Sequence, residues 1–264
     1  MLEAALALIA GLVIGSFLNV CIYRIPRDLS VVRPRSFCPA CDHPIAWYDN
    51  VPLWSYLALR GRCRHCAKPI PVRYPIVEGL TGAAFFLLLL KYGPTLVAAK
   101  YCLFSALVIG LIFSDLETLI LPNEFTLLGL AAGLLLAALV PVRDFYLDWF
   151  LAGRLPDQAV SIVESLLGAA LPSLLLWGLA GLFLLIRHKE GLGLGDVKMV
   201  AMVGAFTGLA GAGLTVMIGS LLGTVIGLIY VYATGKNVRT YELPFGAFLG
   251  AAALAVPFLL PALR

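Results

Sequence analysis

Long apolar stretches separated by short polar connections make up most of this chain. A helix needs roughly 20 mostly apolar residues to cross a bilayer, so each stretch predicts a membrane-spanning helix. The pattern therefore predicts an all-α polytopic membrane protein with about eight transmembrane helices. They fall at about residues 2–23, 74–90, 94–114, 122–141, 159–186, 196–211, 213–233 and 243–262.

The composition excludes the two other broad classes of chain. Of the 264 residues, 61% are apolar and only 13% are charged. A soluble domain of this length has too little interior to hide so much apolar surface. A disordered chain would be far more polar and charged. The first apolar stretch is long and is followed, not preceded, by Arg24 and Arg27, so it is not an obvious cleavable signal.

The distribution of positive charge predicts the orientation in the membrane. Fourteen of the 19 Lys and Arg residues lie in three connections, at 24–73, 187–198 and 235–242. Because basic loops are retained in the cytoplasm, these connections are predicted to be cytoplasmic and both termini to face outward. The turn predicted at 115–121 then also lies on the cytoplasmic side.

The polar segment 24–73 carries a cysteine pattern that is typical of zinc sites. It contains Cys38-Pro-Ala-Cys41 and Cys63-Arg-His-Cys66, and each pair continues as C-x-x-C-x-x-P-I. Two C-x-x-C pairs about 20 residues apart are a strong zinc signature. The alternatives are two disulfides or free thiols, and a cytoplasmic location disfavours disulfides.

Four thiolates complete a tetrahedral shell and leave no position for a substrate or water, so the predicted zinc is structural. A loop of about 50 residues with few large apolar side chains cannot form a sufficient core, so it needs a bound metal to fold. The chain is thus predicted to have three parts: a first transmembrane helix at 1–23, a cytoplasmic, zinc-ribbon-like loop at 24–73, and a transmembrane catalytic domain of about seven helices at 74–264.

Two of the 15 acidic residues stand out by their position. Asp115 directly follows an unbroken apolar run, and Asp196 opens the predicted sixth span in Gly193-Leu-Gly195-Asp196. Carboxylates at membrane depth are costly and suggest function. Both are predicted at the cytoplasmic face, where they could meet. Two close carboxylates that share a proton can activate water and polarise a peptide carbonyl, which is the chemistry of aspartic proteolysis.

The glycines before Asp196 admit two interpretations. Without side chains, Gly193 and Gly195 would let a substrate backbone approach the carboxylate. Alternatively they separate two helices, with Asp196 as an N-terminal cap. The spacing is not that of a dinucleotide-binding fingerprint.

Taken together, these motifs resemble the type IV prepilin peptidases, a family of bifunctional leader peptidases and N-methyltransferases. The resemblance covers almost the whole chain. Asp115 and Asp196 fall at the positions of the family's two catalytic aspartates. Asp196 ends a G-x-G-D motif, and this motif alone would also suit presenilin-type proteases. The resemblance also includes three further elements and the paired cysteines: Gly15-Ser-Phe-Leu-Asn-Val-Cys-Ile-Tyr-Arg24-Ile-Pro26, Arg73-Tyr-Pro-Ile-Val-Glu78 and Pro244-Phe-Gly-Ala-Phe248. There are two departures. Asn123 stands where the family often has aspartate, and Ala247 replaces a usual proline.

The resemblance implies a function and its partners. A prepilin or pseudopilin would lose a short basic leader after a glycine at the cytoplasmic face. The new N-terminal residue would then be methylated from S-adenosylmethionine. The protein would be a multi-pass protein of the bacterial inner membrane, surrounded by lipid, with no nucleic-acid partner. Glu78 and the region from Asn19 to Arg24 are possible contributors to methyl transfer.

Two rival functions use the same features. A proton- or ion-coupled transporter also needs intramembrane carboxylates and glycine-broken helices. Against it, both aspartates are predicted at one face rather than at the midplane, and no convincing inverted repeat is present. An assembly protein could instead bind partners through the zinc loop. Cleavage of a prepilin would discriminate between these functions and proteolysis.

Overall fold

The computed structural model describes residues 1–142, 156–188, 192–235 and 243–260. In these residues the regular structure is helical and no β-strand forms apart from two isolated bridges in the cysteine loop. The chain forms two compact units, Met1–Phe113 and Ser114–Arg264. The predicted division at residues 23 and 73 stays a prediction.

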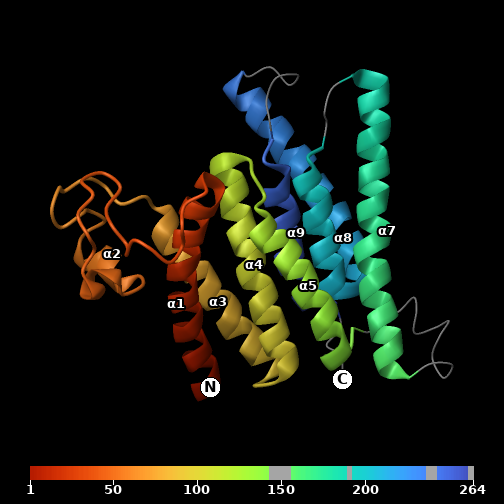
Figure 1. Cartoon of the computed structure of the whole chain (residues 1–264), viewed down its shortest axis with the longest axis horizontal. Coiled ribbons are helices and arrows are strands. Elements are labelled where there is room, and N and C mark those ends of the chain that lie inside the picture. The colour runs from red at the N-terminus through yellow and green to blue at the C-terminus, as the bar shows by residue number, and fades with distance from the viewer. Residues whose placement is uncertain (143–155, 189–191, 236–242, 261–264) are drawn as a thin grey trace. The chain divides into compact units, whose positions relative to one another are not determined.

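The prediction of an all-α membrane protein is confirmed. Five of the described helices are long and apolar enough to cross a bilayer (Figure 1). They are α1 (Leu2–Arg24), α3 (Arg73–Tyr92), α4 (Leu96–Thr118), α7 (Asp157–Arg187) and α8 (Leu194–Thr234). Two further apolar helices, α5 (Asn123–Leu139) and α9 (Phe245–Leu259), are shorter. The count of eight spans is therefore not confirmed.

Helix α8 contains a break where the sequence predicts two separate spans. Gly208 has φ 75° and ψ −172°, values that interrupt the helix and favour glycine. Beyond the break, contacts with α9 show the direction of the chain. Gly211 lies against Val256 and Gly219 against Leu249. The second segment of α8 thus runs antiparallel to α9.

In the first unit, α1 packs along α3 through small residues. A Cβ at Gly15 would lie 2.7 Å from the Cα of Glu78, and one at Gly11 would lie 2.7 Å from the carbonyl oxygen of Thr81. Such close approach of backbones is how helices associate in lipid, where apolar side chains gain little from burial against each other. The cysteine loop between these helices contains only short helical pieces: η1 (Ile25–Arg27), η2 (Trp47–Asn50) and α2 (Trp54–Ala58).

In the second unit, α5, α7 and α9 pack around α8. At the contact of α7 with α8, an added Cβ at Gly204 would overlap the carbonyl of Gly168. Buried hydroxyls strengthen the packing, since Ser165 donates a hydrogen bond of 2.7 Å to the carbonyl oxygen of Ala205. Asp196 lies at the start of α8 in this bundle, and Asp115, at the end of α4, contacts the start of α9.

Two predicted boundaries need comment. The turn predicted at 115–121 is wrong at its start, because α4 continues to Thr118 and places Asp115 in its last turn. The connections predicted at 187–198 and 235–242 fall partly outside the described residues.

Candidate functional site

The two cysteine knuckles of the first unit have the same backbone structure. The N–H of Cys38 donates to the carbonyl oxygen of His43, and the N–H of Cys63 donates to that of Lys68, at 3.0 and 2.9 Å. In the same way, Ile45 bonds to Ser36 and Ile70 to Gly61, at 2.8 and 2.7 Å. The sequence repeat is therefore a structural repeat.

The four predicted metal ligands converge at one point. The Sγ atoms of Cys38, Cys41, Cys63 and Cys66 all lie within 4.8 Å of one another, and those of Cys38 and Cys66 are 3.9 Å apart. Zinc–sulfur bonds of 2.3 Å in a tetrahedron place the sulfurs about 3.8 Å apart. All six cysteines of the chain are free thiols, so the disulfide alternative receives no support. The donor set and spacing fit zinc.

Backbone groups also favour the thiolate form that a metal requires. The N–H groups of Cys66 and His65 point to the sulfur of Cys63 and lower the pKa of this thiol to about 7. Two successive N–H groups aimed at one sulfur stabilise the anion, as they do in other reactive or metal-binding cysteines.

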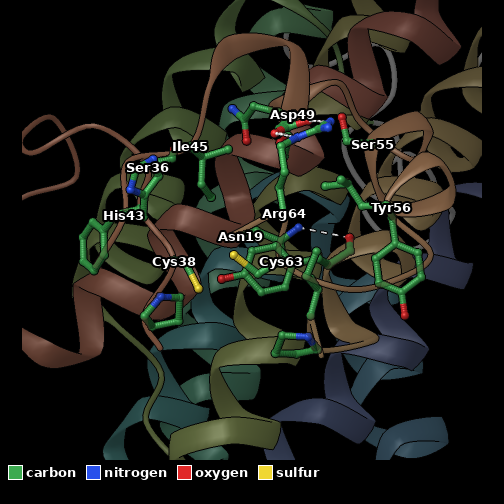
Figure 2. A pocket seen from close by; sticks show the side chains of 18 of the residues that line it. Asn19, Ser36, Cys38, His43, Ile45, Asp49, Ser55, Tyr56, Cys63 and Arg64 are labelled. Carbon is green, nitrogen blue, oxygen red and sulfur yellow. Dashed lines mark hydrogen bonds and ion pairs between the residues drawn. The ribbon is translucent and has the colours of Figure 1, made fainter. Parts of the chain in front are cut away.

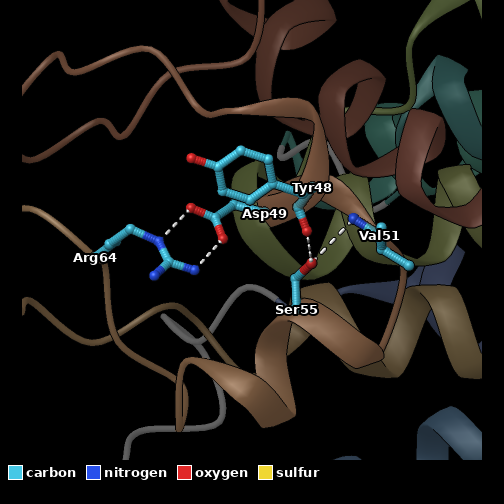
Figure 3. A network of polar contacts seen from close by, with 5 residues as sticks. All are labelled: Tyr48, Asp49, Val51, Ser55 and Arg64. Carbon is cyan, nitrogen blue, oxygen red and sulfur yellow. Dashed lines mark hydrogen bonds and ion pairs between the residues drawn. The ribbon is translucent and has the colours of Figure 1, made fainter.

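A network of polar contacts holds the loop together around the knuckles (Figure 3). Arg64 donates two hydrogen bonds to the carboxylate of Asp49, at 2.7 and 2.6 Å, and holds the pKa of Asp49 below its usual value. Ser55 accepts from the N–H of Val51 and donates to the carbonyl oxygen of Tyr48. The second knuckle is thereby tied to η2, and η2 to α2.

In the second unit, the carboxylate of Asp115 caps the N-terminus of α9. Its Oδ2 accepts a hydrogen bond of 2.8 Å from the N–H of Ala247, and the N–H of Gly246 also bonds to the carboxylate. The N–H of Ala247 also bonds to the carbonyl oxygen of the N-cap residue Pro244, at the longer distance of 3.2 Å. The positive end of the helix dipole favours an anion at this position. Asp115 is only 5% exposed.

Asp196 lies in the first turn of α8 and is 8% exposed. Its carboxylate bonds to the N–H of Gly193, which is the N-cap residue. This is the acidic half of a capping box. Asp196 therefore has a local structural contact, although it is not itself the N-cap. The structure also brings the two carboxylates close enough for their charges to interact.

Leu121 lies at the meeting point of the two helix starts. A Cβ at Gly195 would be 3.0 Å from the Cβ of Leu121, and one at Gly246 would be 2.9 Å from its Cδ1 and 3.1 Å from Asp115 Oδ2. Larger residues would push Leu121 and Asp115 away from the helix ends. The packing therefore requires a glycine at position 195. At Gly193 a Cβ would meet no tight contact, since the nearest atom would be Asp196 Oδ2, at 3.5 Å.

The arrangement places two buried carboxylates at the N-termini of α8 and α9. Close carboxylates of this kind can share one proton, so that one acts as base and the other as acid. Sequence reasoning missed the contact of Asp115 with Gly246 and Ala247. Asn123, which it left out of the pair, accepts a hydrogen bond of 2.9 Å from Lys198.

Comparison with known proteins gives matches along most of the chain. Residues 9–92 match the bacterial peptidase A24 N-terminal domain, and residues 102–228 match the type IV leader peptidase family. No solved structure matches the chain.

Three similar proteins carry the name prepilin leader peptidase/N-methyltransferase. The protein of Myxococcus xanthus is 40% identical over 235 residues, which cover 89% of this chain and 65% of that protein. The protein of Burkholderia pseudomallei strain 1026b is 34% identical, over 97% of this chain and 85% of its own. That of Aeromonas hydrophila is 32% identical, over 94% and 88%.

Proposed function

Since the chain belongs to the type IV leader peptidase family, we propose that it is a membrane aspartic endopeptidase that removes the leader of prepilins or pseudopilins and then N-methylates the new N-terminal residue. The observation that supports this most is the pair of buried carboxylates in the second unit, Asp115 in the last turn of α4 and Asp196 in the first turn of α8. The transporter alternative receives no support from the comparisons.

In the proposed mechanism, Asp115 and Asp196 are the catalytic residues. The ionised carboxylate takes a proton from water as the water attacks the peptide carbonyl, and the protonated one polarises the carbonyl oxygen. The C–N bond then breaks and the leaving amine receives a proton from the pair. The N–H groups of Gly246 and Ala247 orient Asp115 in this scheme.

Gly193 and Gly195 were predicted to let the substrate backbone approach Asp196. We retain this proposal for Gly193, whose Cβ position faces the carboxylate. For Gly195 the contact with Leu121 supports the alternative, a packing role beside the site.

Two cofactors belong to the proposal. Zinc on Cys38, Cys41, Cys63 and Cys66 would have a structural role, because four thiolates leave no open position. S-adenosylmethionine would supply the methyl group. The relatives' name, N-methyltransferase, supports such a donor.

The contact between Ala247 and Asp115 gives a prediction particular to this chain, because a proline at position 247 could not donate this hydrogen bond. Ala247→Pro should slow cleavage about threefold to tenfold without abolishing it, since one hydrogen bond contributes roughly 1 kcal/mol and Gly246 still donates. The rate is measured on a purified prepilin, with Ala247→Gly as the control that keeps the N–H. A loss as complete as that in Asp115→Asn, or no change, would contradict the assigned contact.

We place the protein in the bacterial inner membrane with the active site at the cytoplasmic face. The two ends of α7 test this orientation, because Asp157 and Arg187 lie at opposite ends of an apolar helix and are both exposed. In spheroplasts, a thiol reagent that cannot cross the membrane should label Asp157→Cys, and should label Arg187→Cys only after permeabilisation. The reverse pattern would overturn the orientation.

The proposed function is tested by incubating the purified protein with a prepilin and S-adenosylmethionine. We expect a shortened product, followed by a gain of one methyl group at its new N-terminus. An intact prepilin would refute the peptidase, and a shortened but never methylated product would refute the second activity alone.

A further inference from the structure

A groove of about 440 Å³ opens in the first unit between α1 and the cysteine loop, which lie side by side in Figure 1. Val13, Phe17 and Val20 of α1 line one wall, and residues of the loop line the other. Ser36 and Ile45 line both this groove and the neighbouring cavity drawn in Figure 2. The two catalytic carboxylates belong to the second unit, so the proposed proteolysis does not use this groove.

The α1 wall of the groove is apolar and belongs to a helix that is long enough to cross the membrane. Val13, Phe17 and Val20 follow the i, i+4, i+7 spacing that places side chains on one face of a helix. Val13 and Phe17 are 57% and 54% exposed, so the protein leaves much of this face uncovered. At membrane depth, an uncovered apolar face lies against acyl chains.

The loop wall adds two large apolar side chains, Val32 and Trp47, to the same groove. Both are exposed to a high degree, at 78% and 75%. An exposed tryptophan beside a spanning helix suits the boundary between lipid and water, where its ring contacts acyl chains and its N–H bonds to headgroups. The loop therefore offers the groove a surface that a lipid could cover.

Two arginines, Arg24 and Arg35, give the groove positive charge, and none of the described residues that line it is acidic. Arg24 is 5% exposed and donates hydrogen bonds to the carbonyl oxygens of Ser30 and Arg35, at 2.8 and 3.3 Å. A guanidinium has five N–H donors, so three remain. In the described part of the chain, no carboxylate forms an ion pair with Arg24. Because a buried charge without a counter-ion is costly, this arrangement indicates an anionic ligand.

The charged and apolar parts of the groove are spaced for a single lipid molecule. At a rise of 1.5 Å per residue, Arg24 lies about 10 Å along α1 from Phe17 and about 16 Å from Val13. One leaflet of the hydrocarbon core is about 15 Å deep, which is half of the full thickness. A lipid with its phosphate at Arg24 would therefore lay an acyl chain along Phe17 and Val13.

We propose that this groove binds an anionic phospholipid, whose phosphate contacts Arg24 and Arg35 and whose acyl chain lies along Val13 and Phe17. Basic pockets at the ends of spanning helices bind acidic headgroups in this way. A lipid in the groove contacts both α1 and the loop, so it ties the cysteine loop to the membrane surface. The inference does not rest on the proposed proteolysis.

The charge of the groove disfavours two other occupants. A second copy of this chain, docked face to face on the groove, would bring its own Arg24 and Arg35 to the same place, and like charges repel. The leader of a prepilin, which the resemblance implies is basic, would meet the same repulsion. A lipid without net charge would fit the apolar wall but would leave the arginines uncompensated.

The test measures the Kd of a fluorescent phosphatidylglycerol for the full-length protein in a neutral detergent, with unlabelled phosphatidylglycerol or phosphatidylcholine as competitor. The wild type is compared with Arg35→Gln, which removes one charge at an exposed position and keeps the carbonyl that accepts from Arg24. Arg33→Gln is the matched control, because Arg33 is exposed in the same segment but does not line the groove. A phosphatidylglycerol with a photoreactive acyl chain is also cross-linked to the wild type, and the labelled residues are mapped.

We expect phosphatidylglycerol to displace the fluorescent lipid at least about tenfold better than phosphatidylcholine does. Arg35→Gln should raise the Kd about fivefold, because a single basic residue near the headgroups contributes about this factor. Arg33→Gln should stay within about twofold of the wild type. The cross-links should fall in residues 13–24 and 31–52.

Equal competition by the two lipids would overturn the inference, as would a wild-type Kd in Arg35→Gln or cross-links spread evenly over the apolar helices. Displacement of the lipid by a prepilin would show that the substrate occupies the groove, and a lipid Kd that rises with protein concentration would show that a second copy does. Either result would overturn the inference as well. If Arg35→Gln does not fold, the competition and the cross-linking map of the wild type decide.

Discussion

Replacing Asp115 or Asp196 with asparagine should reduce leader cleavage at least about a thousandfold. The substitution keeps the size of the side chain and removes its ability to ionise. At Asp115, the amide oxygen can still accept from Gly246 and Ala247, so the start of α9 should stay in place. The loss would therefore reflect chemistry and not unfolding. The rate is measured with purified variants and a prepilin.

The matched control is Asp157→Asn, the same change in the first turn of the apolar helix α7. It should leave the cleavage rate within about twofold of the wild type, as expected for an exposed surface substitution. A near-normal cleavage rate in either Asp115→Asn or Asp196→Asn would contradict the mechanism with two carboxylates.

Removing one metal ligand should unfold the cysteine loop. Purified protein should contain about one zinc ion per chain, and Cys38→Ser or Cys63→Ser should lose it. Structural zinc sites contribute roughly 10–16 kcal/mol of apparent binding free energy, which is most of what holds such a small unit together. The measurements are metal content by mass spectrometry and the rate at which a protease cuts between residues 36 and 70.

Cys102→Ala serves as the control for cysteine loss, because Cys102 is buried in α4 and apart from the four ligands in sequence and structure. This variant should keep its zinc and its protease resistance. A metal-free wild-type protein whose loop resists the protease as well as that of Cys102→Ala would show that the four thiols do not hold a structural metal.

The cluster of four cysteines could be predicted from the sequence because each pair is local. The repeat of C-x-x-C-x-x-P-I determines the turns, and the structure repeats the same hydrogen bonds in both knuckles. The sequence also singles out Asp115 and Asp196, since a carboxylate beside an apolar run is unusual, and their catalytic role stays a prediction. The groups that surround each carboxylate could not be predicted from the sequence.

The contact of Ala247 with Asp115 joins residues 132 positions apart, and no spacing rule reaches across that distance. The contact of Gly15 with Glu78 likewise depends on how α1 packs against α3. The count of eight spans is not confirmed, for another reason. Apolar length does not reveal where a helix ends, so α5 and α9 are shorter than their apolar stretches. The break of α8 at Gly208 lies near the predicted junction of two spans.

The most direct test of the account is to give Asp196→Asn two substrates, a full-length prepilin and a pilin whose leader has already been removed, each with S-adenosylmethionine. Mass spectrometry then reports both the N-terminus and its methylation. We predict that the variant leaves the full-length prepilin intact and unmethylated but methylates the pre-cleaved pilin as the wild type does. Cleavage of the full-length prepilin by this variant would contradict the central claim that Asp115 and Asp196 together perform the proteolysis.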